Sequence, residues 1–313
     1  MKLLRHVSFI GNKFTGIVST SYQFGICDYS TSKQSSPAEY CVDMVRTHDY
    51  ENFLCTLLLP NECRTSAFAI RAFNIEVARV QDSVSEVTIG QMRMKFWEDT
   101  LEKIYQNDVP KHPVAMELYR AVKRHKLSKR YLKRLISVRA NHLITSTYPN
   151  IEAMESYAEN SVSSVLYLML ECSGLQNVHA DHAASHLGKA QGITNLIRSI
   201  PHNAQHRVIP LPQDVLVKHS VSQEMVVRGS REKPLRDVIF DVACRARQHL
   251  DKARSLSSDV PKSAHVIFLP AITIDSYLEK LQQSDFDVFD GSLQQRNNFL
   301  PISLLWNKLR LKY

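Results

Sequence analysis

The most informative residues of this chain lie on a segment whose polar side chains follow the period of an α-helix: Gln191, Asn195, Arg198, Ser199 and Asn203. Positions three and four apart lie on one side of a helix, so we expect these side chains to face the same space. Carboxylates at such positions on two facing helices would bind Mg²⁺, which prefers oxygen ligands from carboxylates, water and phosphates. None of these five residues is acidic.

A second segment, earlier in the chain, carries Ala78, Arg79 and Asp82 at similar spacing. Only Asp82 is acidic, and Arg79 brings a positive charge to a position where a cation would otherwise bind. The two segments together offer too few anionic oxygens for a metal cluster, so we expect no bound metal and no cofactor. Arg79 and Asp82 are three residues apart, and the simpler interpretation is an ion pair on the helix surface, worth a few tenths of a kcal/mol.

Composition excludes several classes of protein. Glycine accounts for 9 of 313 residues, well below the average of about 7%, and no Gly-rich dinucleotide or P-loop motif is present. The net charge of +8 is spread along the chain. Basic residues concentrate between Lys123 and Arg139 without an aromatic stacking platform, which indicates a solvated helix surface and no nucleic-acid site. Contact of this basic stretch with an anionic membrane leaflet is the alternative.

The first 37 residues have a different character from the rest. They contain Lys2, Arg5 and Lys13, many Ser and Thr, and no acid before Asp28. This composition is typical of a mitochondrial transit peptide, which we expect to be disordered; the alternative is a disordered N-terminus without a targeting role. Six cysteines without a Cys-x-x-Cys pair fit a reducing compartment. Residues 38–313 are expected to form one helical domain.

Hydrophobic periodicity predicts helices almost throughout those residues, with no convincing strand. Gly174 is expected to end one of them, and no run is long enough to span a bilayer. The proline-containing stretch 202–214 is expected to be a loop. The predicted helices are Tyr40–Leu58, Glu62–Val87, Gln91–Tyr105, Val114–Lys123, Tyr131–Leu143, Met154–Cys172, Leu235–Leu256, His265–Gln283 and Leu300–Leu311.

The two polar segments resemble the aspartate-rich motifs of the squalene/phytoene synthase family. Residues 190–203 are similar to its second motif, Gln-x-x-x-Asn-x-x-Arg-Asp-x-x-x-Asp, with Ser199 and Asn203 at the aspartate positions. The earlier segment resembles the first motif, in which Ala78 and Arg79 replace two of three aspartates. In that family the aspartates hold Mg²⁺, which stabilises the charge leaving an allylic diphosphate. The resemblance therefore implies a pseudoenzyme.

The resemblance runs from about residue 40 to the C-terminus. Tyr50–Pro60 matches the opening Phe-x-x-x-Leu-Leu-Pro run of the family, with Asn52 in place of a serine that contacts substrate phosphate, and Arg64 also has a counterpart. Ser163 and Leu166 replace glycines that let a prenyl chain approach the backbone, so their side chains should narrow the cavity. Further similar stretches are 207–212, 268–281 and 286–290.

The implied fold is an all-α, isoprenoid-synthase-like helical bundle around a central cavity. The chain is most similar to mitochondrial members of the family that assist assembly of respiratory complex I, NADH:ubiquinone oxidoreductase. This implies a non-catalytic assembly factor, peripheral on the matrix side of the inner membrane. Its expected partners are complex I subunits or other assembly factors.

Two alternative functions remain open at this point. A divergent prenyltransferase would use Asp82, Gln191, Asn195 and Arg198. A lipid- or isoprenoid-binding protein would use the cavity without chemistry, with Arg64, Arg79 and Arg198 as contacts for a phosphate or lipid headgroup. Guanidinium groups are well suited to that contact because they donate paired hydrogen bonds to phosphate oxygens.

Three histidines and the C-terminal segment also have a spacing or composition that could serve binding. His179, His182 and His186 have a spacing that would allow Zn²⁺ binding, although a polar helix start is the simpler interpretation. The C-terminal segment combines apolar and basic side chains, which suits an interfacial membrane helix, but such a helix can equally dock on the bundle. The predicted membrane contacts are Leu304, Leu305, Trp306, Lys308, Arg310 and Lys312.

Overall fold

The computed structural model describes residues 36–84 and 86–313, so the predicted transit peptide lies almost entirely outside the described residues. The first helix begins with a capping box. The Ser36 hydroxyl accepts the Glu39 N–H, the Glu39 carboxylate accepts the Ser36 N–H, and Pro37 occupies the first turn. These contacts satisfy N–H groups that a helix start leaves without partners, which explains why the helix begins here.

The described residues contain no β-strand, which confirms the prediction of an all-α fold. The α-helices are α1 (Pro37–His48), α2 (Tyr50–Leu57), α3 (Asn61–Ala78), α4 (Val87–Tyr105), α5 (Pro113–His125), α6 (Lys129–Ile144), α7 (Ile151–Ala158), α8 (Ser164–Cys172), α9 (Val178–Gln205), α10 (Gln213–Lys218), α11 (Gln223–Val227), α12 (Lys233–Ser255), α13 (Pro270–Gln283) and α14 (Leu300–Leu309). Between them lie the 3₁₀ turns η1 (Gln81–Ser83), η3 (Lys262–Phe268) and η4 (Gly291–Gln294), and the π-helix η2 (Glu159–Ser163).

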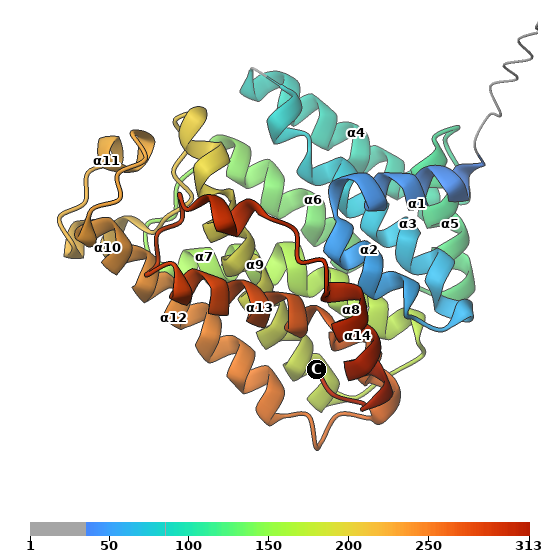
Figure 1. Cartoon of the computed structure of the whole chain (residues 1–313). Helices are drawn as coiled ribbons and strands as arrows, with labels where there is room; N and C mark the ends of the chain where they lie inside the picture. Colours follow the sequence, from blue (N-terminus) through green and yellow to red (C-terminus); the bar gives the residue numbers. More distant parts are fainter. Residues whose placement is uncertain (1–35, 85) are drawn as a thin grey trace, which may run out of the picture. The chain divides into compact units, whose positions relative to one another are not determined.

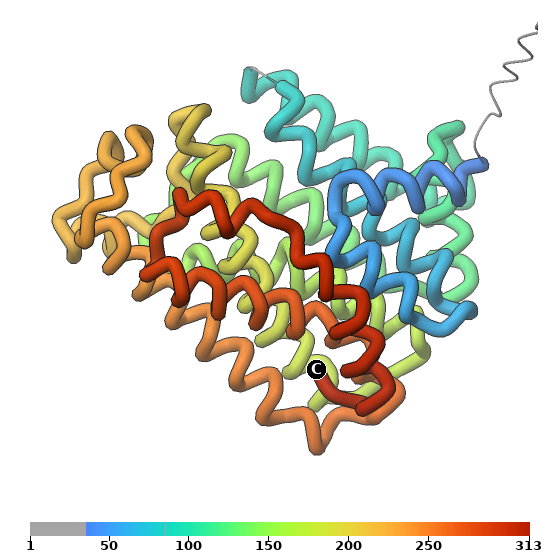
Figure 2. The backbone as a smooth tube through the Cα atoms, viewed as in Figure 1, coloured from blue at the N-terminus to red at the C-terminus, as the bar shows by residue number. Residues whose placement is uncertain are grey.

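Helix α9 is the element around which the others are arranged. It packs against α12, α7, η2, α8 and α13 (Figure 1). Helices α1, α2, α3 and α5 pack on one another, and α3 and α5 also contact α8. After α13 the chain runs back along the bundle before it enters α14 (Figure 2). Segments distant in sequence thereby meet at α9.

The contact between α9 and the α7–η2 segment is unusually close. A Cβ atom added at Gly188 would lie 2.5 Å from the backbone of Ser163, and one added at Gly192 would lie 2.4 Å from the Ala158 Cβ. Glycine is therefore the residue that permits this approach. The Ser163 hydroxyl donates to the Ser185 carbonyl at 3.0 Å across the same contact.

Four predicted helices differ from the observed ones. In the predicted helix His265–Gln283, residues 265–268 belong to the 3₁₀ turn η3, and α13 begins at Pro270. The other three contain breaks. The predicted helix Tyr40–Leu58 is two helices, because Asp49 adopts φ −147° and ψ 60° between α1 and α2. The predicted helix Glu62–Val87 ends at Ala78, and the π-helix η2 interrupts the predicted helix Met154–Cys172. No glycine or proline marks these three breaks.

The proline-containing stretch was also predicted incorrectly at its start. Helix α9 continues through Pro201 to Gln205, and α10 begins at Gln213, before the predicted end of the loop. Helix α11 follows in a region with no predicted helix. The stop at Gly174 is confirmed. Gly174 has a φ of 66°, and the Leu175 N–H donates to the Leu170 carbonyl, as in a Schellman cap.

The three histidines of the predicted zinc alternative do not converge. His186 instead contacts His249 on α12, with 2.9 Å between their Nδ1 atoms, and His249 lies 3.2 Å from the Glu155 carboxylate. Burial, with a contribution from His249, lowers the pKa of His186 to about 4. His179 and His182 are exposed. Among the described residues no three His, Cys, Asp or Glu side chains are grouped to hold a metal ion.

Helix α14 has two apolar faces. Leu304 is fully buried, where it packs with Leu300, Cys55 and Leu269, so the prediction of a membrane contact at Leu304 was wrong. The opposite face is exposed, with basic side chains following it. Its exposed apolar residues are Ile302 (67%), Leu305 (49%), Trp306 (58%) and Leu309 (71%), and the basic ones are Lys308, Arg310 and Lys312. Within residues 36–84 and 86–313, no helix has both the length and the apolarity to cross a bilayer.

The close approach of α9 predicts that Gly188→Ala destabilises the protein. Alanine favours a helix by about 1 kcal/mol over glycine, but overpacking costs about 1–3 kcal/mol or more. The atoms that the added Cβ would meet are the Ser163 hydroxyl oxygen at 2.1 Å and the Ser163 backbone at 2.5 Å. Urea unfolding of the purified variant measures the net decrease in the free energy of unfolding. Gly291→Ala is the control, because nothing lies within 4 Å of its added Cβ. Its free energy of unfolding should stay within about 0.5 kcal/mol of the wild-type value. Equal stability of the two variants would contradict the role of Gly188.

Candidate functional site

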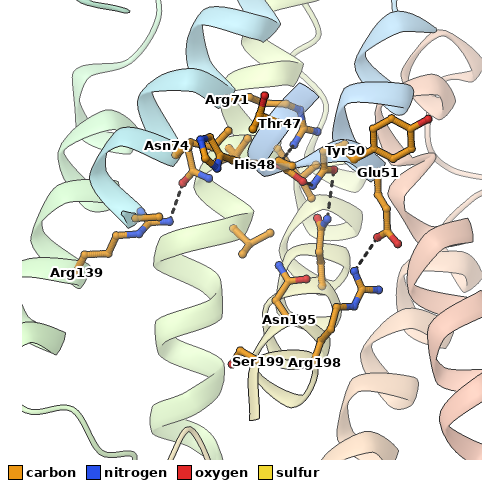
Figure 3. Close-up of a pocket in the computed structure, with 18 of the residues that line it drawn as sticks. Thr47, His48, Tyr50, Glu51, Arg71, Asn74, Arg139, Asn195, Arg198 and Ser199 are labelled. Atoms are coloured by element: carbon orange, nitrogen blue, oxygen red, sulfur yellow. Dashed lines mark hydrogen bonds and ion pairs between the residues drawn. The ribbon is translucent and has the colours of Figure 1, made fainter. Parts of the chain in front are cut away.

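A cavity of about 640 Å³ lies where the junction of α1 and α2 meets α3, α6, η2, α8 and α9. Figure 3 shows side chains from these elements pointing into it. Its volume is within the range of about 300–1,000 Å³ found for small-molecule sites. It is therefore the candidate functional site.

The break at Asp49 turns that residue and Asn52 into the cavity. The Asn52 amide donates to both carboxylate oxygens of Asp49 at 2.9 and 3.1 Å, and its own oxygen accepts from Gln191 at 3.3 Å. Arg71 on α3 approaches Asp49 at 3.8 Å. Burial raises the pKa of Asp49, although Arg71 and Asn52 oppose the rise. This network joins α2, α3 and α9 across the cavity.

On the other side of the cavity, Arg139 of α6 meets Asn74 of α3 (Figure 3). Its Nη2 donates to the Asn74 side-chain oxygen at 2.7 Å, and its Nη1 donates to the Leu135 carbonyl at 2.8 Å. Burial lowers the pKa of the Arg139 guanidinium, while Tyr157 and Tyr148 oppose this effect. No carboxylate of the described residues forms an ion pair with it.

Two further arginines line the open side of the cavity. Arg198 contacts Glu51 at 2.9 Å and lies over the Tyr277 ring, 4.5 Å from its centroid. Arg296, from the segment that runs back to α14, lies over the Tyr50 ring at 4.9 Å. The lining contains four arginines but only two carboxylates. The site therefore carries excess positive charge.

The second predicted segment lies at this cavity. Gln191, Asn195, Arg198 and Ser199 all line it, as their helical spacing predicted. Asn203 does not, and its amide instead donates to the Ser199 hydroxyl at 2.9 Å. No side chain of this segment offers a carboxylate to the cavity.

The first segment is divided by the end of α3. Ala78, its last residue, lines the cavity, whereas Arg79 is an exposed helix cap and Asp82 is exposed on η1, outside the lining. Arg64 donates to the Leu59 carbonyl at 2.9 Å and also lies outside the lining. The predicted ligand contacts of Arg64 and Arg79 were therefore wrong for this cavity, and of the three predicted arginines only Arg198 reaches it.

Sequence reasoning missed Arg71, Asn74 and Arg139. Arg139 was grouped with the solvated basic stretch, yet it is buried. The only available signal was a charged residue inside an otherwise apolar helical pattern, as for Arg71 between Ile70 and Ala72. That signal indicates burial but does not identify what the side chain contacts.

The apolar part of the cavity wall is small. It consists of Ile75, Ala78, Val162, Val165 and Leu166. Leu166, whose side chain was predicted to narrow the cavity, lies in this wall. Ser163 does not belong to the lining, because its side chain faces α9.

Comparison with known proteins places these features in a family. A family model described as squalene/phytoene synthase matches residues 45–300. The chain is 49% identical over 279 residues to a Bos taurus protein named NADH dehydrogenase (ubiquinone) complex I, assembly factor 6, covering 89% of this chain and 84% of that one. The Homo sapiens protein of the same name is 49% identical over 274 residues, 88% of this chain and 82% of that one.

Among solved structures, a dehydrosqualene synthase in complex with ligand has a TM-score of 0.76 at 16% identity, covering 88% of this chain and 95% of that chain. This likeness shows a shared fold and confirms the predicted isoprenoid-synthase-like bundle. Together with the family match over residues 45–300, it identifies this chain as a member of the squalene/phytoene synthase family.

Proposed function

We propose that this protein is a non-catalytic assembly factor for respiratory complex I. The observation that carries the proposal is identity of about half the residues over most of both chains with relatives named complex I assembly factor 6. Its partners are then complex I subunits or other assembly factors. Mitochondrial import by residues 1–37 belongs to the same proposal, supported by their basic, acid-poor composition.

The chemistry of the cavity supports the absence of prenyl transfer. Both carboxylates of its lining face cations: Glu51 pairs with Arg198, and Asp49 lies near Arg71 and accepts from Asn52. Neither is free to join a Mg²⁺ cluster without losing these contacts. The competing prenyltransferase would need Asp82, which lies outside the cavity lining.

The exposed face of α14 supports peripheral contact with the matrix side of the inner membrane. Trp306 and Leu309 would enter the interface, while Lys308, Arg310 and Lys312 would lie near anionic headgroups. Leu304, on the buried side, instead fixes the helix to the bundle. The exposed apolar patch and Lys308 lie on α14, and Arg310 and Lys312 lie in the residues that directly follow it.

Loss of the protein should lower the amount of fully assembled complex I on native gels. Re-expression of the wild-type chain should restore it, because the defect would be one of assembly. Respiratory complexes III and V serve as internal controls. Normal complex I in cells that lack the protein would refute the assembly role.

Purified protein should form no product from farnesyl or geranylgeranyl diphosphate in the presence of Mg²⁺, since the cavity lacks free carboxylates to bind the metal. Mass spectrometry of the reaction measures this, with an active squalene synthase as positive control. Product formation that disappears in Asp82→Ala would establish the competing prenyltransferase instead.

The double substitution Trp306→Ala, Leu309→Ala should weaken binding to vesicles that contain anionic lipid by roughly tenfold or more, because two large apolar side chains no longer enter the interface. Vesicle flotation measures the effect. The control is Met92→Ala, Phe96→Ala, which removes an exposed apolar pair from α4. Equal losses in the two double variants would argue against α14 as the contact.

A further inference from the structure

We propose that a pocket beside α14 binds the headgroup of an anionic phospholipid, with the lipid phosphate held by three lysines. This pocket, the C-terminal pocket, has a volume of about 200 Å³ and is lined by Lys262 of η3 together with Lys308 and Lys312. It shares no lining residue with the central cavity. The proposal rests on the proposed contact of α14 with the membrane and names the lipid chemistry that this contact recognises.

The turn that follows α14 is fixed against η3. The Leu311 N–H donates to the Lys308 carbonyl at 3.1 Å. The Lys312 N–H donates to the Asn307 carbonyl at 3.0 Å, which completes a Schellman cap. The Leu311 carbonyl oxygen in turn lies 2.8 Å from Nδ1 of His265 in η3. These contacts hold the end of α14 beside the element that carries the third lysine.

Leu311 occupies a position at which glycine is usual. Its φ of 52° lies in the left-handed region, which is unfavourable for a bulky side chain. The Leu311 side chain lines the pocket beside Val266, yet it remains 46% exposed, so its burial offsets little of this strain. Strained residues cluster at ligand sites, where a bound group makes use of their position. Leu311 and Val266 thus form an apolar floor that a ligand can cover.

The pocket lining carries three lysines and no carboxylate. Within the described part of the chain, Lys262, Lys308 and Lys312 form no ion pair. Like charges around one small pocket repel one another, and an anion between them removes that repulsion. Lysine binds phosphate as a point charge on a flexible stem, so three lysines can surround one phosphodiester.

A phospholipid matches both the charge and the apolar floor of the pocket. Its phosphate supplies the negative charge, and the first part of an acyl chain covers Leu311 and Val266. The helix directly before this turn exposes further apolar surface at Trp306 (58%) and Leu309 (71%). A free phosphate compound would engage the lysines but leave the apolar floor in water. Anionic phospholipid is therefore the occupant that the lining selects.

Calorimetry with dihexanoylphosphatidylglycerol, a short-chain lipid used below its micelle concentration, tests the pocket in the full chain. Wild-type protein should bind, and Lys262→Gln, Lys312→Gln should bind at least roughly tenfold more weakly, because two charges beside the phosphate are gone. Lys103→Gln, Lys111→Gln is the matched control, since it removes the same charge from exposed positions outside the pocket. Absence of wild-type binding, or equal weakening in the two double variants, would overturn the proposal.

Glycerol 3-phosphate distinguishes a lipid site from a site for free phosphate compounds. It carries a phosphate without acyl chains, so it should bind at least roughly tenfold more weakly than the short-chain lipid, because the apolar floor stays uncovered. Binding as tight as that of the lipid would overturn the assignment to a phospholipid.

The variant Leu311→Gly separates ligand contact from a structural role of this residue. Glycine adopts the left-handed conformation without strain, so the variant should melt at the wild-type temperature or higher. Its affinity for the short-chain lipid should fall by roughly fivefold or more, because part of the apolar floor is removed. A lower melting temperature with unchanged lipid affinity would assign Leu311 a structural role and contradict the proposed pocket.

The short-chain lipid binds without a bilayer, so its outcome is distinct from that of vesicle flotation. Flotation that depends on Trp306 and Leu309, without short-chain lipid binding, would reject the pocket and leave the membrane contact of α14 standing. Lysine-dependent binding of the short-chain lipid, without flotation of the wild-type protein, would support the pocket and reject the membrane contact.

Discussion

The close contact between α9 and the α7–η2 segment is the constraint on which the cavity depends. Gly188 and Gly192 remove the side chains that would hold the two backbones apart. Gln191 lies between these glycines in sequence, and its amide reaches Asn52 on α2. Asn195 and Arg198 follow on the same helix, so their distance from α3 and α6 is set by this contact. Packing of neutral residues thus fixes the positions of the polar ones.

The charges of the cavity lining differ from those of a metal-binding site. In a metal-dependent site, carboxylates bind cations that in turn bind phosphate. Here the positive charge is carried by arginine side chains held by the fold, and two of them are buried. Fixed cations need no metal uptake, but they do not supply the Lewis acidity that helps a diphosphate leave.

Much of the fold followed from hydrophobic periodicity, because apolar positions at helical spacing must be buried somewhere in a bundle. The second polar segment was placed correctly for the same reason, since a long uninterrupted helix keeps its register from Gln191 to Ser199. The first segment was not, because α3 ends at Ala78 without a glycine or proline to signal it. Arg139 was misplaced because it was grouped with the basic residues that precede it between Lys123 and Arg134, and local composition does not reveal which face of α6 is covered.

The π-helix η2 has a consequence for how the cavity wall can change. Its wider hydrogen-bonded turn sets the rotation of α8 relative to α7, and α8 carries Val165 and Leu166 into the cavity. Removing one residue from Glu159–Ser163 would turn α8 by about 100°, so both side chains would leave the wall. Inserting or deleting one residue in η2 would therefore change the shape of the cavity wall more than most side-chain replacements within that wall.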